Sequence, residues 1–129
     1  LRKAHPVFRR RTFFTAATPG TPEILWHGVQ PVQPDFSTTS RRLAFALDGR
    51  RCDRPDVVDR DFYVAMNADD HAENFQIPAS PSGRPWRRVV DTALASPDDF
   101  QDVDQGPEIA VMSTYPVQAR SLIILASSA

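Results

Sequence analysis

Residues 61–78 read DFYVAMNADDHAENFQIP, and this stretch decides the fold class. Apolar side chains recur at every second position of residues 62–66 and again in residues 75–77. A period of two is typical of a β-strand. Between the two runs lie Asp69 and Asp70, whose short polar side chains favour a turn. The stretch therefore predicts a β-hairpin.

The rest of the chain repeats this pattern of short apolar segments between turn signals. Six further segments have it: Ile24–Val29, Arg42–Leu47, Trp86–Thr92, Ile109–Met112, Tyr115–Val117 and Leu122–Ala126. The last of them is apolar on both faces, so we expect it to be a central strand. Twelve prolines exclude long helices. The fold class predicted is all-β, an antiparallel β-sandwich of about seven to eight strands.

The first 22 residues differ from the rest. Leu1–His5 is predicted to be the last turn of a helix that Pro6 ends, because proline disfavours helical geometry in the residue before it. The basic run Arg9–Arg11 is interpreted as a solvated or partner-facing linker rather than a nucleic-acid site. We therefore expect residues 1–22 to be a helical remnant with its linker and residues 23–129 to be the sandwich domain.

Composition narrows the functional classes. A chain of 129 residues suits one domain with a real core. The net charge of −1 removes the electrostatic case for nucleic acid or an anionic membrane, and no apolar run approaches the ~20 residues that span a bilayer. The single cysteine, Cys52, cannot form an internal disulfide, which favours a reducing compartment and a cytoplasmic location. Residues 48–60, rich in Arg, Asp and Gly, predict a long exposed connection.

No catalytic or metal-binding constellation is evident, so we predict no catalytic residue, metal or cofactor. The carboxylates lie in segments of turn composition, where they bind local backbone amides. His5, His27, His71 and Cys52 show no metal-ligand spacing. Calcium at residues 67–73 is the alternative for that turn, although the glycine and ligand order of a calcium loop are missing. An independent small enzyme would require a carboxyl pair that converges in a pocket.

Two tryptophans are the candidate binding residues. Trp26 and Trp86 each offer a flat apolar ring that could stack on a sugar, although tryptophans of a sandwich more often pack in its core or at a domain interface. His27, next to Trp26, could donate to a sugar hydroxyl, or it could simply end a strand before Gly28.

A family resemblance covers nearly the whole chain. The segments that carry it are Arg2–Phe8, Trp26–Gly28, Gln33–Ser37, Ser40–Phe45, Tyr63–Ala68, Trp86–Thr92, Ser96–Phe100, Tyr115–Val117 and Arg120–Leu125. In this order they resemble the last barrel helix, linker and C-terminal domain of isoamylase-type glycogen and starch debranching enzymes. The resemblance implies a β-sandwich packed beside a (β/α)₈ barrel, and hydrolysis of α-1,6 branch linkages by residues of the barrel. None of the barrel motifs is present, so no catalytic residue is carried over to this chain.

The resemblance gives two functional hypotheses. In the first, the chain is a non-catalytic accessory domain that packs on and stabilises the barrel, through the linker Val7–Phe14 and with Trp26 and Phe36. In the second, it is an α-glucan-binding module that uses Trp26 or Trp86 as a platform. The residues expected at a glucan contact or barrel interface are therefore Trp26, His27, Phe36 and Trp86.

Overall fold

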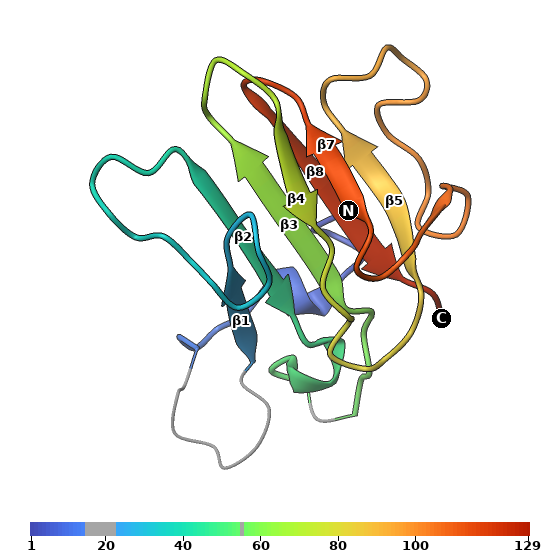
Figure 1. Cartoon of the computed structure of the whole chain (residues 1–129). Coiled ribbons are helices and arrows are strands. Elements are labelled where there is room, and N and C mark those ends of the chain that lie inside the picture. The colour runs from blue at the N-terminus through green and yellow to red at the C-terminus, as the bar shows by residue number, and fades with distance from the viewer. Residues whose placement is uncertain (15–22, 55) are drawn as a thin grey trace.

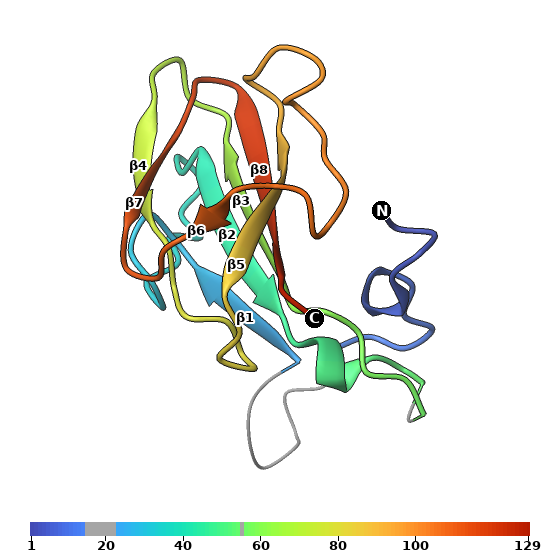
Figure 2. The same ribbon diagram turned by 90° about the vertical axis from the view of Figure 1, so that its right-hand side faces the viewer.

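The computed structural model describes residues 1–14, 23–54 and 56–129, which form eight β-strands in two sheets. The larger sheet has the strand order β1 (Ile24–His27), β2 (Arg42–Leu47), β3 (Phe62–Asn67), β8 (Ser121–Ser127), β5 (Trp86–Asp91) and β6 (Glu108–Ile109). The smaller sheet pairs β4 (Glu73–Gln76) with β7 (Thr114–Val117). Every pair is antiparallel, and the smaller sheet lies over one face of the larger one (Figures 1 and 2). The predicted antiparallel sandwich is confirmed, and β8 is central, as its apolar faces indicated.

The predicted hairpin of residues 61–78 is wrong in its pairing, although both of its strands exist. β3 pairs with β2 and β8, whereas β4 pairs only with β7 in the other sheet. The chain therefore crosses from one sheet to the other between Asn67 and Glu73. A period of two shows that each strand has a buried face, but it does not show which strand is its neighbour. Here the two strands face each other across the core.

The main core lies between the two sheets. It consists of fully or almost fully buried side chains of both sheets and of adjoining residues: Ala44, Ala46, Tyr63, Ala65, Phe75, Ile77, Trp86, Val117, Ile123 and Leu125. The alanines of β2 and β3 belong to the same cluster as Phe75 and Val117 of the smaller sheet, so both layers contribute to one core.

A second apolar cluster covers the opposite, outer face of the larger sheet. The N-terminal segment, residues 1–14, lies on this face (Figure 2). Its Val7 is only 2% exposed, and Phe8 packs on Phe62 of β3 with ring centroids 4.6 Å apart. The middle strands of this sheet are apolar on both faces, so the smaller sheet packs on one face and the N-terminal segment packs on part of the other.

The beginning of the N-terminal segment corrects one expectation. Leu1–His5 forms a turn, closed by a hydrogen bond from Ala4 N to Leu1 O, and a 3₁₀ helix, η1 (Pro6–Phe8), follows it. Pro6 thus begins a short helix instead of ending one, because its fixed φ suits the first helical position. No α-helix occurs in the described part of the chain. The expected domain boundary after residue 22 falls outside the described residues and stays a prediction.

The connection of residues 48–60 is less exposed than its composition predicted. It contains a second 3₁₀ helix, η2 (Gly49–Arg51), and the side chain of Asp48 is fully buried. Asp48 accepts hydrogen bonds from the backbone and guanidinium of Arg50 at 2.8–3.0 Å. Asp61, 1% exposed, accepts from Gly49 N and Ser82 N at 2.9 Å. Buried carboxylates that satisfy backbone amides hold this connection against the sheet.

Candidate functional site

Trp86, one of the four expected site residues, lies in the main core. Its side chain is 0% exposed, and its indole N–H donates a hydrogen bond of 2.7 Å to the carbonyl of Pro78. The centroid of its ring lies 6.3 Å from that of Tyr63 of β3, which belongs to the same core. Trp86 therefore has no free face to offer to a sugar or to another domain, and the expectation that it forms part of a surface site is corrected.

His27 is also turned inward. It is 3% exposed, and its Nδ1 accepts a hydrogen bond of 2.8 Å from Val32 N. Burial lowers the pKa of His27 below 6.5, so the imidazole is neutral at pH 7. Its Nε2 is buried among described residues that offer it no partner. His27 fixes the loop after β1 and does not face a surface ligand.

Trp26 and Phe36 do come together at the surface. Trp26 is 40% exposed and Phe36 is 67% exposed, and their rings meet edge to face with centroids 5.7 Å apart. Phe45 of β2 also contacts Trp26 edge to face, with ring centroids 5.6 Å apart. Such edge contacts fix the orientation of an indole ring while part of it stays in water.

A groove extends from this aromatic pair along the N-terminal segment. It has a volume of about 400 Å³, and its lining is mostly apolar: Val7, Phe8, Arg10, Thr12, Phe13, Phe14, Ile24, Trp26, Phe45 and Leu47. Phe13 is 95% exposed at its edge. Exposed aromatic side chains gathered at one groove are typical of an interaction surface.

The outer face of the larger sheet continues beyond the groove. Leu43, Met66 and Leu122 lie side by side on β2, β3 and β8, as the strand registers show, and all three are only partly buried. The N-terminal segment packs at the other end of these strands, against Leu47, Phe62 and their neighbours. Sequence analysis missed this row of apolar side chains, although the two apolar faces of the last strand were a signal for it.

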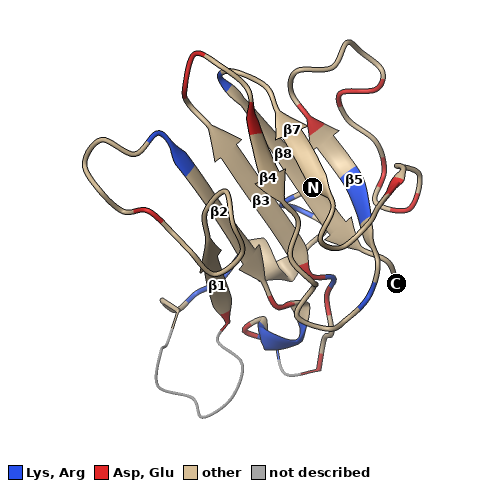
Figure 3. Cartoon of the chain, viewed as in Figure 1, with Lys and Arg blue, Asp and Glu red and all other residues tan. Residues whose placement is uncertain are grey.

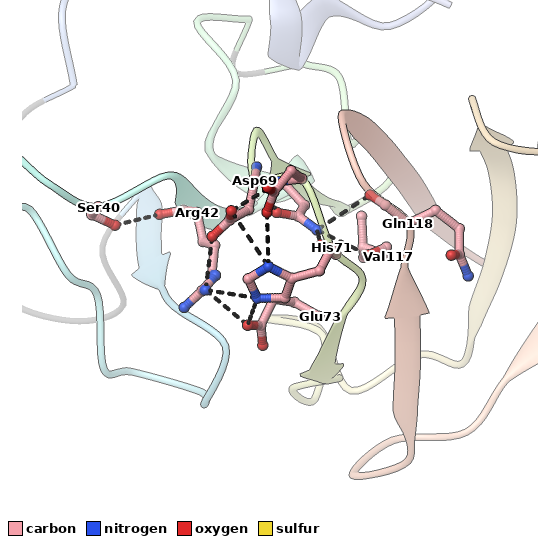
Figure 4. A network of polar contacts seen from close by, with 9 residues as sticks. Ser40, Arg42, Asp69, His71, Glu73, Val117 and Gln118 are labelled. Atoms are coloured by element: carbon pink, nitrogen blue, oxygen red, sulfur yellow. Dashed lines mark hydrogen bonds and ion pairs between the residues drawn. The ribbon is translucent and has the colours of Figure 1, made fainter.

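Charged residues lie mainly at strand ends and in connections (Figure 3). One network lies where the chain crosses between the sheets (Figure 4). Arg42 Nη2 is 3.0 Å from Asp69 Oδ2 and 2.8 Å from Glu73 Oε1, and His71 lies within 3.3 Å of Asp70 and Glu73. Asp69, Asp70 and His71 are close enough together to hold a metal ion.

The carboxylates of this network are nevertheless already paired with its own members, Arg42 and His71. Arg42 supplies a cation to Asp69 and Glu73, and the hydrogen bond with Asp70 raises the pKa of His71, which favours the imidazolium over the neutral ligand form. Asp69 Oδ1 also accepts from Asp70 N at 2.8 Å, which is the turn-forming role predicted for this pair. The network is therefore best explained as an ion-pair cluster that fixes the crossover.

Within the described residues, no helix is both long enough and apolar enough to cross a membrane.

Comparison with known proteins identifies what the chain is similar to. A family model described as isoamylase 1-3, C-terminal, matches residues 25–125. Isoamylase 1, chloroplastic, of Arabidopsis thaliana is 33% identical over 83% of this chain and 14% of its own length. The glycogen operon protein GlgX homolog of Mycobacterium tuberculosis (strain ATCC 25618 / H37Rv) is 32% identical over 97% of the chain and 18% of its own length. Isoamylase of Flavobacterium sp is 30% identical over 96% of the chain and 17% of its own length. The chain thus spans less than a fifth of the length of each of these relatives.

Proposed function

Because the chain belongs to the isoamylase C-terminal domain family, we propose that it is a non-catalytic accessory domain that packs on and stabilises a catalytic (β/α)₈ barrel of the same polypeptide. The complete protein would hydrolyse α-1,6 branch linkages of glycogen or a related α-glucan, and the barrel would carry the chemistry. The cytoplasmic location expected from the lone Cys52 is part of the same proposal.

The observation that supports this function is that the outer face of the larger sheet is apolar and only partly covered. Its strands are apolar on this side, yet the N-terminal segment packs on only one end of them. The row Leu43, Met66 and Leu122 is left partly in water. Burial of such a row against a second domain would stabilise both parts by about 25 cal/mol per Å² of apolar surface removed from water.

The aromatic groove extends the same surface. Val7 and Phe8 of the linker already pack on this chain's own sheet, whereas Phe13, Trp26 and Phe36 stay exposed. The proposed contact with the barrel therefore includes Trp26 and Phe36, as the sequence led us to expect, and adds the row on β2, β3 and β8.

A charge placed on this row tests the proposal. Leu122→Glu should change the stability of the isolated 129-residue chain by less than about 1 kcal/mol, because the site is only partly buried there. In the complete protein it should lower the melting temperature and the yield of active enzyme, because the glutamate would be buried without a partner. Asn74→Glu, at an exposed position of β4, is the control. Equal melting temperatures and equal yields of active enzyme for the two variants of the complete protein would refute packing through this face.

Glucan binding is the second candidate, and the exposed pair Trp26 and Phe36 favours it. An indole face with an apolar neighbour can stack on the CH groups of a sugar ring, by analogy with other aromatic platforms. Affinity electrophoresis of the complete protein in a glycogen gel tests it. Retardation that Trp26→Ala and Phe36→Ala abolish, while Val111→Ala leaves it unchanged, would support binding; migration equal to that of a gel without glycogen would exclude it.

A further inference from the structure

The structure places the side chains of the basic run Arg9–Arg11 in two different environments. The side chain of Arg10 is 10% exposed and pairs with Glu23 and Asp53, each at 3.1 Å. It also donates to Arg51 O at 2.6 Å. Its neighbours Arg9 and Arg11, one residue away on either side, instead line a separate cavity.

This cavity is strongly basic. It has a volume of about 380 Å³, within the range of about 300–1,000 Å³ of small-molecule sites, and its lining residues are Pro6, Arg9, Arg11, Asp53 and Arg54. The one carboxylate, Asp53, is already engaged. It pairs with Arg10 and accepts hydrogen bonds from Arg11 N and from the backbone and hydroxyl of Thr12.

The three arginines of the cavity lack comparable partners. Within the described ranges, the guanidinium groups of Arg9 and Arg11 have no ion pair or hydrogen bond. Arg54 reaches Asp56 only at 3.9 Å, with both side chains more than half exposed, and such a pair contributes little. The cavity therefore holds an excess of positive charge, since three arginines line it and its one carboxylate, Asp53, already pairs with Arg10.

The segment that carries Arg9 and Arg11 is held in place. Asp59 accepts hydrogen bonds from His5 Nδ1 at 2.7 Å and from Val7 N at 3.0 Å. Asp53 holds the backbone of Arg11 and Thr12. Three like charges kept near one cavity repel each other, and a bound anion would offset that repulsion.

We propose that Arg9, Arg11 and Arg54 form a binding site for a phosphate monoester. A phosphate dianion matches the excess charge, and the planar guanidinium fork binds its oxygens in pairs. The ester can be a free sugar phosphate or a phosphate group carried on an α-glucan; the second source rests on the proposed function, the first does not.

Isothermal titration of the complete protein with glucose 6-phosphate and with inorganic phosphate tests the site without any glucan. We expect saturable binding that Arg9→Gln and Arg54→Gln each weaken at least tenfold, while Arg41→Gln, an exposed position outside the cavity with the same charge change, leaves it unchanged. Binding that all three variants weaken equally would be a general charge effect and would overturn the proposal. A complete protein that binds neither ligand would also overturn the proposal. This holds even if the isolated 129-residue chain binds them, because the barrel would then fill the cavity in the complete protein.

A second titration separates the two sources. Tighter binding of a phosphorylated maltooligosaccharide than of glucose 6-phosphate, with no binding of the phosphate-free oligosaccharide at this site, would assign the ester to the glucan. Equal affinities of the two phosphorylated ligands would assign a free phosphate compound. Both results retain the arginine site, and neither depends on branch cleavage.

Discussion

Asn67, at the end of β3, donates a side-chain hydrogen bond of 3.1 Å to the carbonyl of Val117, at the end of β7, and so joins the two sheets. The same amide donates to His71 O at 2.8 Å, and its Oδ1 accepts from Asp69 N at 3.0 Å. Asn67 is only 2% exposed. Asn67 therefore fixes the chain at the point where it leaves the larger sheet for the smaller one.

Asn67→Ala should lower the free energy of unfolding by about 1–3 kcal/mol, because buried carbonyl groups would lose their donor. Urea denaturation of the 129-residue chain measures this. Asn74→Ala, at an exposed position of β4, should change the stability by less than about 0.5 kcal/mol. Equal losses in the two variants would show that Asn67 does not hold the sheets together.

This residue also shows what the sequence could predict about the fold. The alternation around Asn67 correctly placed a strand on each side of Asp69 and Asp70, and the short segments with turn signals correctly indicated a sandwich. The strand pairing could not be predicted, because it depends on contacts between segments far apart in the sequence, such as β4 with β7. A local pattern shows only which face of a strand is buried. A hairpin and a crossover between sheets bury the same faces, so the pattern cannot distinguish them.

The candidate site was predictable only in part, for a similar reason. Trp26 and Trp86 are chemically identical in the sequence, and only the fold places one at the surface and the other in the core. The aspartates at 48 and 61 lie in or beside a stretch of loop composition, yet both are buried because they bind backbone amides. Burial of a polar group depends on its partners, which its own sequence neighbourhood does not reveal.

The two tryptophans should differ in solvent access. Acrylamide should quench the fluorescence of Trp26, which is 40% exposed, far more than that of Trp86, which is 0% exposed. The variants Trp26→Phe and Trp86→Phe each leave one emitter, so each spectrum reports one ring. Similar quenching constants would contradict the placement of Trp86 in the core.

Replacement of each tryptophan by alanine should also affect the stability of the chain to different extents. Trp86→Ala should lower the free energy of unfolding by about 3–5 kcal/mol, because it leaves a cavity in the core and removes the donor to the Pro78 carbonyl. Trp26→Ala should cost clearly less, since part of the ring is already in water. Thermal denaturation followed by circular dichroism gives both values. A larger loss of stability for Trp26→Ala than for Trp86→Ala would contradict the placement of Trp86 in the main core.

The buried histidine makes the stability depend on pH. Burial lowers the pKa of His27 in the folded chain, so the unfolded chain binds the proton more readily. The free energy of unfolding should therefore fall as the pH decreases below about 6.5, the ordinary value for histidine. His27→Asn should remove this part of the pH dependence, which urea titrations at pH 8 and pH 5 would measure.

His71 supplies the control, because its shift has the opposite sign. The hydrogen bond with Asp70 raises the pKa of His71, so its contribution is present at low pH and is lost as the pH rises through that raised pKa. A proton NMR titration should place His27 below 6.5 and His71 above it. The reverse order would contradict both the buried position of His27 and the ion-pair cluster around His71.

The N-terminal segment should depend on Asp59 for its attachment. Asp59 accepts hydrogen bonds from His5 Nδ1 and Val7 N, and its side chain is only 6% exposed. Asp59→Ala should release the segment and speed tryptic cleavage at residues 9–11 several-fold, because proteases cut opened backbone. Asp56→Ala, whose side chain is 74% exposed, should leave the cleavage rate unchanged. If Asp59→Ala were cut no faster, the apolar contacts of Val7 and Phe8 alone would hold the segment on the sheet, and the arginine cavity would not depend on this carboxylate.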